Sequence, residues 1–132
     1  MHGVHGEDLS AVDEIGTAVL GAALNVRRTF GPGLLENAYE AFLAHELTKD
    51  GHKVDRQLAL PAVLGEVRID IGYRIDLLVD DLVVVEVKAV EQLAAVHEAQ
   101  LLTYLRLSGR RLGYLINFNV PVLKQGIRRR VL

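Results

Sequence analysis

The 132-residue chain has no cysteine and no tryptophan, and aromatic residues make up only 5% of it. The absence of cysteine excludes disulfides and thiolate metal sites. Few aromatic rings disfavour strong binding of single-stranded nucleic acid, which relies on base stacking. No apolar run reaches the roughly 18 residues that a membrane span needs. The first ten residues also lack the basic-then-apolar pattern of a secretory signal. We therefore expect a cytoplasmic protein without a membrane partner.

The charges of the chain are unevenly distributed. The formal net charge is −2, but Glu98 is the last acidic residue, and residues 99–132 contain seven lysines and arginines. A basic C-terminal third indicates a polyanionic partner such as nucleic acid. On charge alone, a solvated basic surface without a partner is the better explanation. Arg128, Arg129 and Arg130 lie in a predicted edge strand with its basic side chains outward.

The length is that of one domain, and no repeat, low-complexity segment or linker divides it. We predict a flexible N-terminus over 1–9 and a single domain over 10–132. Apolar spacing, together with breaks at glycine and proline, predicts the secondary structure. Helices are expected at about 11–29, with Ser10 as N-cap, at 34–50, and at 91–107. Strands are expected at 54–60, 62–64, 67–71, 73–89 (a hairpin), 112–118 and 127–132. The order of the main elements, α-α-β-β-β-α-β, predicts a mixed sheet flanked by helices, in the α/β or α+β class.

The hairpin over 73–89 contains the strongest functional signal. Its two apolar runs predict strands that are buried on at least one face, yet Asp76, Glu86 and Lys88 interrupt them. A buried carboxylate is destabilising unless it is paired or bound to a metal. One explanation is an ion pair between Lys88 and a carboxylate. The other is a site where the carboxylates hold a hard divalent cation and the lysine orients a water or stabilises developing charge.

The second explanation places a condition on the hairpin loop. Side chains alternate between the two faces of a strand, so Glu86 and Lys88 share a face. A two-residue turn at Asp80–Asp81 would leave Asp76 on the opposite face. A three-residue loop over 80–82, or a bulge, would place Asp76 across from Glu86. The metal site therefore predicts an odd-length loop or a bulge.

Two helices carry further candidate residues. Glu36 lies in the first turn of the second predicted helix, where it either stabilises the helix dipole or provides a third carboxylate directed at the metal. His97, Gln100 and Tyr104 form a line on the third predicted helix, at spacings of three and four residues. A polar line on a buried face needs partners. The partners are either internal hydrogen-bonding groups or a phosphate or metal-bound water.

Five segments in this order resemble the GxxExxY family, which is placed in the PD-(D/E)xK nuclease superfamily. The similarity extends over about residues 10–132, nearly the whole chain. Five ordered motifs are far more specific than an isolated D…ExK pattern. The segments are GLLENAY at 33–39, YRIDLLV at 73–79, VVVEVKAVE at 83–91, HEAQLLTYL at 97–105 and GYLINFNVP at 113–121.

The resemblance implies a restriction-endonuclease-like fold and a nuclease active site. Each motif is matched residue by residue. The D…(D/E)xK motif falls on Asp76, Glu86 and Lys88, the helix acid on Glu36, and the QxxxY motif of RecB-like exonucleases on Gln100 and Tyr104. Ile75 replaces the proline that names the superfamily, at a position that varies widely there.

The residue chemistry agrees with phosphodiester hydrolysis. Asp76 and Glu86 would hold Mg²⁺ (or Mn²⁺), with the Val87 carbonyl as a further oxygen ligand. Lys88 would position the attacking water or act as base if burial lowers its pKa. The remaining candidates would act as follows: Glu36 orienting a metal-bound water, Gln100 and Tyr104 holding the scissile phosphate or the Lys88 amine, and His97 with Arg128, Arg129 and Arg130 contacting phosphates more weakly.

The sequence thus predicts a metal-dependent nuclease acting on phosphodiester bonds of DNA. The alternative is a non-catalytic nucleic-acid-binding or protein-binding module that retains the nuclease fold. Carboxylates converging at Asp76 and Glu86, with Lys88 beside them, would favour catalysis. A closed Glu86–Lys88 ion pair covered by the third helix would favour the alternative. The small size is compatible with a homodimer.

Overall fold

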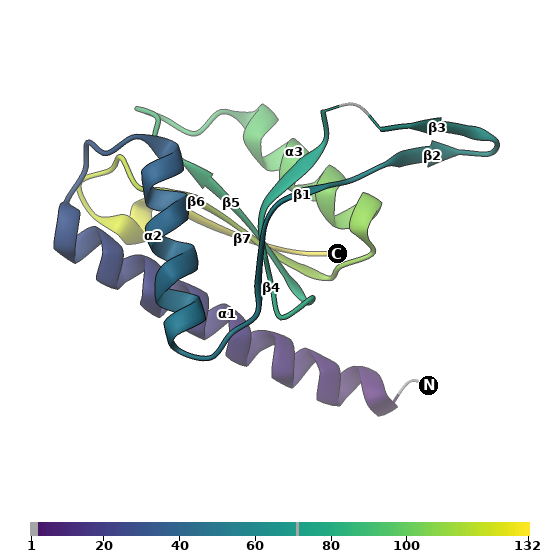
Figure 1. The fold of residues 1–132 in the computed structure, drawn as a ribbon, viewed down its shortest axis with the longest axis horizontal. Coiled ribbons are helices and arrows are strands. Elements are labelled where there is room, and N and C mark those ends of the chain that lie inside the picture. Colours follow the sequence, from purple (N-terminus) through teal and green to yellow (C-terminus); the bar gives the residue numbers. More distant parts are fainter. Residues whose placement is uncertain (1–2, 71) are drawn as a thin grey trace.

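A computed structural model describes residues 3–70 and 72–132. The described residues form three α-helices, one 3₁₀ helix and seven strands (Figure 1). The helices are α1 (Gly3–Phe30), α2 (Glu36–Lys49), α3 (Ala95–Ser108) and the 3₁₀ helix η1 (Leu123–Gly126). The strands are β1 (Val54–Ala59), β2 (Ala62–Leu64), β3 (Val67–Ile69), β4 (Arg74–Val79), β5 (Val83–Lys88), β6 (Leu112–Asn117) and β7 (Ile127–Val131).

Five of these strands form one mixed sheet in the order β1-β4-β5-β6-β7. β5 and β6 are parallel, and the other neighbours are antiparallel. Parallel strands need a crossover connection, which α3 provides. The architecture is the predicted mixed sheet flanked by helices and is consistent with a restriction-endonuclease-like fold. The predicted edge strand near the C-terminus is confirmed as β7, at one edge of the sheet.

The sheet has an apolar cluster on each face. On one face, α1 and α2 pack against strand residues that include Val83, Val85 and Val87. On the other, α3 packs against residues that include Val84 and Leu115. Because β5 is covered on both faces, its sequence is almost continuously apolar. Alternation along β5 then places the side chain at 86 on the α3 face, with that of Val84.

The β4–β5 hairpin has the odd-length loop that the sequence predicted. The register pairs Val79 with Val83, which leaves a three-residue loop over 80–82. Asp80 has a φ of 52°, in the left-handed region, and its carboxylate accepts a hydrogen bond from the Lys53 backbone N–H at 2.8 Å. This bond fixes the turn against the segment before β1. Continuing the register brings Asp76 opposite Glu86, so this prediction is confirmed.

Some predicted boundaries differ from the structure. α1 begins at Gly3, so Ser10 lies inside the helix and is not its N-cap. The helix can extend this far because the first proline of the chain is Pro32. The helix includes residues 3–9, whose predicted flexibility stays a prediction, and residues 1–2 lie outside the described part. α3 begins at Ala95, later than predicted. The His97 Nδ1 accepts the Ala94 backbone N–H at 3.0 Å and thereby caps the first turn.

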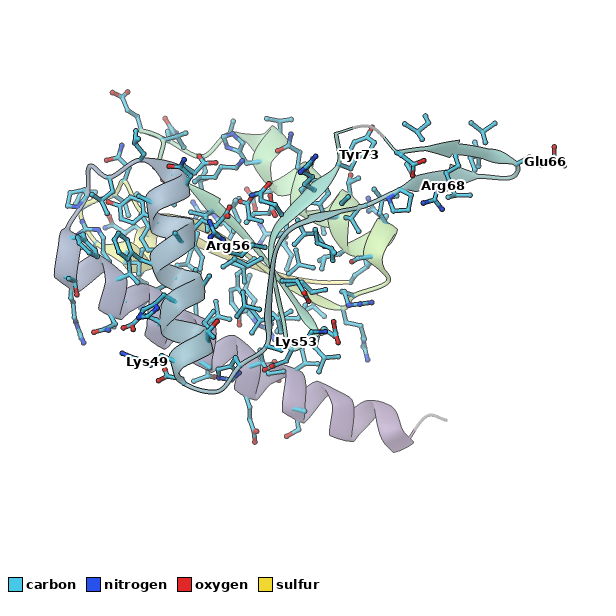
Figure 2. All side chains as sticks on the ribbon, in the orientation of Figure 1. Lys49, Lys53, Arg56, Glu66, Arg68 and Tyr73 are labelled. Carbon is cyan, nitrogen blue, oxygen red and sulfur yellow. The ribbon has the colours of Figure 1, made fainter. Side chains whose placement is uncertain are left out.

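β2 and β3 form a separate two-stranded hairpin that projects from the sheet (Figure 1). Its tip carries Glu66, far from the body of the domain, and its second strand carries Arg68 (Figure 2). The strand predicted over 67–71 ends at Ile69, and residue 71 lies outside the described residues. No helix within 3–70 and 72–132 has the length and apolar content to span a bilayer.

Candidate active site

The site begins where β4 and β5 separate. The backbone ladder between them ends at the pair Leu77–Val85. One residue further, the Asp76 backbone N–H donates to the Glu86 Oε2 at 2.8 Å. In return, the Val87 backbone N–H donates to the Asp76 Oδ2 at 2.8 Å. Each carboxylate thus accepts a backbone N–H of the opposite strand, in place of the backbone carbonyl that would accept it in a regular ladder. The two predicted acids are brought together in a fixed orientation.

The two carboxylates are electrostatically coupled. Glu86 is only 5% exposed, and this burial raises the pKa of its carboxyl to about 8, with the charge of Asp76 raising it further. The Asp76 backbone hydrogen bond and the positive charge of Lys88 act in the opposite direction. A buried carboxyl group beside a second, half-buried carboxylate gives two oxygen donors that repel each other when both are ionised, and a hard divalent cation stabilises such a pair.

Lys88 lies two residues after Glu86 on β5, so the two side chains share a face. Lys88 is half-buried. Among the described residues, no carboxylate oxygen lies within 4.0 Å of its amine. The closed Glu86–Lys88 ion pair expected for the non-catalytic alternative is therefore not formed, and the amine is free to interact with another group.

Helix α3 presents one of its three predicted polar residues to the carboxylates. Tyr104 is half-buried; burial raises the pKa of its hydroxyl, and the charges of Glu86 and Asp76 raise it further. Gln100 lies one turn earlier and is exposed. The side chain of His97 caps the helix by accepting the Ala94 backbone N–H. Of the two kinds of partner that the sequence allowed for His97, this is the internal hydrogen bond. The structure therefore brings Tyr104, but not His97, to the site.

On helix α2, the acid whose charge interacts with Asp76 is Glu40, which was not among the predicted residues. Glu36 is exposed in the first turn, where it stabilises the helix dipole. Glu40 is only 5% exposed. Burial raises the pKa of its carboxyl, and the nearby charge of Asp76 raises it further. The signal in the sequence is a charged residue next to Tyr39 on the buried stripe that includes Leu43.

Two adjacent residues of β1 complete the network, and the sequence analysis identified neither. Arg56 donates from Nε and Nη2 to the Glu40 Oε2, at 3.2 and 3.0 Å. The Gln57 Nε2 donates to the Glu40 Oε1 at 2.7 Å and to the Asp76 Oδ1 at 3.1 Å. Figure 2 shows Arg56 between β1 and α2, where it links the edge of the sheet to the helix.

The three arginines predicted to contact phosphates, Arg128 to Arg130, lie away from the carboxylates of Asp76 and Glu86. β7, which carries them, is at the opposite edge of the sheet from β1. Arg128 donates to backbone carbonyls, and Arg129 pairs with Asp13 at 2.8 Å. Arg130 pairs with Glu98. The three side chains are thus held by the domain itself and do not gather around the carboxylates.

The donor set fits a metal that needs few protein ligands. Within residues 10–70 and 72–132, whose side chains the structure describes, no group of three or more His, Cys, Asp or Glu side chains is placed to hold a metal ion. Asp76 and Glu86 therefore form a two-carboxylate site. Mg²⁺ usually keeps several waters and is bound through one or two carboxylates. The carbonyl of Val87, the residue after Glu86, is a further oxygen in the same strand.

Comparison with known proteins agrees with this geometry. A sequence model of the PD-(D/E)XK nuclease superfamily matches residues 13–130. This range includes β1 to β6, all but the last residue of β7, and all the carboxylates of the site. Searches among curated proteins and among solved structures gave no match. The chain belongs to the PD-(D/E)XK nuclease superfamily.

Proposed function

We propose that the protein is a metal-dependent nuclease of the GxxExxY type that hydrolyses phosphodiester bonds of DNA. The observation that carries this proposal is the reciprocal bonding of Asp76 and Glu86 at the point where β4 and β5 separate. It leaves buried Glu86 and half-buried Asp76 side by side. The amine of Lys88, which forms no ion pair among the described residues, lies on the same face as Glu86. A purely structural cluster would be expected to neutralise these charges within the protein.

In the proposed site, Asp76, Glu86 and the Val87 carbonyl hold Mg²⁺ or Mn²⁺. The bound ion supplies polarisation of the scissile phosphate and a more acidic water. Lys88 orients the attacking water and stabilises the negative charge that develops on the phosphate. The hydroxyl of Tyr104 stays protonated because its pKa is raised, so it can donate a hydrogen bond to a phosphate oxygen. Gln100, which lies one turn earlier on α3 and is exposed, contacts the DNA backbone next to the scissile phosphate in this proposal.

A cleavage panel tests the proposal. Single-stranded and double-stranded DNA and RNA are incubated with the protein in Mg²⁺, in Mn²⁺ and in a chelator. We expect cleavage of DNA with either ion and none with the chelator. Asp76→Asn removes one proposed ligand charge and should abolish the activity. A folded wild-type protein that neither cleaves any substrate nor binds Mn²⁺ in calorimetry would favour the non-catalytic module.

A matched pair of variants tests which helix acid belongs to the site. Glu40→Gln should lower the cleavage rate at least tenfold, since it removes a buried charge that interacts with Asp76. Glu36→Gln, one helical turn earlier and exposed, should change the rate less than about threefold. Rates are compared at saturating Mg²⁺, and urea denaturation verifies that both variants fold. Equal effects of the two substitutions would contradict the assignment of Glu40.

A further inference from the structure

Gln57 has an unusual backbone conformation for a strand residue. Its φ is 52°, in the left-handed region that residues other than glycine seldom occupy. The strand ladder is interrupted at the same point. Arg56 pairs with Leu77 and Leu58 pairs with Ile75, but the intervening residue Gln57 makes no ladder pair. Such a conformation is unfavourable and persists only when the surrounding structure imposes it.

The conformation changes the direction of the side chains in β1. Consecutive residues of a regular strand point to opposite faces of the sheet. Arg56 and Gln57 are consecutive, yet both hydrogen-bond to the Glu40 carboxylate, one to each oxygen. The positive φ at Gln57 is what breaks the alternation. The backbone strain therefore accompanies a specific result, which is that the Gln57 amide reaches the carboxylates.

The amide is suited to hold two carboxylates at once. Its NH₂ group has two hydrogens and carries no charge, and it donates both to Glu40 and to the Asp76 Oδ1. The other oxygen of Asp76 accepts the Val87 N–H. Both oxygens of Asp76 are thus held, from β1 on one side and from β5 on the other. Each carboxylate oxygen has two lone pairs, so Oδ1 keeps one for a metal ion.

We propose that Gln57 is a positioning residue that fixes the rotation of the Asp76 carboxylate and holds Glu40 beside it. Its strained backbone is retained because it delivers the amide to these two acids. The consequence for metal binding rests on the proposed function. The consequence for the Asp76 carboxylate does not, because the hydrogen bonds join protein groups alone. Loss of a group that orients a metal ligand typically weakens metal binding by about 10- to 100-fold.

The test compares two glycine substitutions in the same edge strand. Gln57→Gly removes the amide and accepts the positive φ without strain. Ala59→Gly, at an exposed position with no polar group, introduces the same flexibility but leaves the amide in place. The first readout, on metal-free protein, is the NMR scalar coupling across the hydrogen bond from the Val87 nitrogen to the Asp76 carboxyl carbon. The second is Mn²⁺ affinity by calorimetry.

We expect Gln57→Gly to reduce the coupling below half its wild-type value and to weaken Mn²⁺ binding about tenfold or more. Its urea midpoint should equal or exceed that of the wild type, because strain is relieved. Ala59→Gly should keep both the coupling and the affinity while losing some stability. Gln57→Asn should behave like Gln57→Gly, because asparagine tolerates the positive φ but its side chain is shorter than that of glutamine. The asparagine variant replaces the glycine variant in the test if the glycine variant fails to fold.

Two results would overturn the proposal. One is a wild-type coupling in Gln57→Gly, and the other is a wild-type protein that shows no coupling at all. A different result separates the two proposals. If the wild type binds no Mn²⁺ but the coupling still falls in Gln57→Gly, the positioning role stands and the metal-dependent function fails.

Discussion

Replacing Lys88 with alanine is expected to slow metal-dependent DNA cleavage by about 10³-fold, within the range that a positioned proton-transfer or water-orienting group contributes. The amine is half-buried on the same face as Glu86, and it makes no ion pair with a carboxylate of the described residues. Its removal therefore breaks no ion pair among the described residues. Initial rates at saturating Mg²⁺ measure the effect, and the affinity for DNA should change by less than about threefold.

Lys49→Ala is the matched control for the loss of one positive charge. Lys49 lies on α2 and is exposed, and its one ion pair among the described residues is with Glu46 on the same helix. Exposed pairs of this kind contribute about 1 kcal/mol or less to stability. Cleavage by Lys49→Ala should match that of the wild type. A Lys88→Ala variant that retains most of its activity would exclude the amine from the chemical step and require another group to orient the water.

The hairpin was predictable because its signals are local. Alternation along a strand and the length of one loop are enough to decide whether Asp76 can meet Glu86. Both follow from residues within a short segment, and the structure has the expected three-residue loop. The unusual feature of that segment, two acids and a lysine among valines and leucines, is also visible without any knowledge of tertiary packing.

The contributions of α2 and β1 were harder to predict because they depend on how distant elements pack. Glu36 and Glu40 lie one helical turn apart, and only the packing of α2 on the sheet decides which of them approaches Asp76. Placing Glu40 on the apolar stripe would have identified it. Gln57 gave no such signal, since its role depends on a left-handed backbone conformation that glutamine seldom adopts.

The metal-free protein should lose stability as the pH rises from about 5 to 8. The pKa of Glu86 is raised from the usual 4.5 to about 8, mainly by burial. The folded state therefore binds a proton that the unfolded state has released throughout this interval. Stability linked to this proton is fully present below pH 4.5 and is lost as the pH approaches 8. At about 1.4 kcal/mol per pKa unit, we expect a loss on the order of 3 to 5 kcal/mol.

Urea denaturation in a chelator, at half-unit steps of pH, measures this loss. Glu86→Gln keeps a hydrogen-bond acceptor but cannot ionise, so most of the pH dependence should disappear in this variant. A smaller dependence of the same sign should remain, because burial also raises the pKa of Glu40. A wild-type free energy of unfolding that is constant between pH 5 and 8 would contradict a protonated Glu86 in the metal-free state.

Adding Mg²⁺ should reverse the loss, because a bound cation favours the ionised carboxylate. Binding must then displace the Glu86 proton, so the apparent affinity should rise about tenfold per pH unit up to about pH 8 and level off above it. Stabilisation by a fixed Mg²⁺ concentration should accordingly be larger at pH 8 than at pH 6, and Glu86→Gln should show neither effect. If Mg²⁺ stabilises the wild type equally at both pH values, the ion binds away from Glu86, and the two-carboxylate site is not where the metal acts.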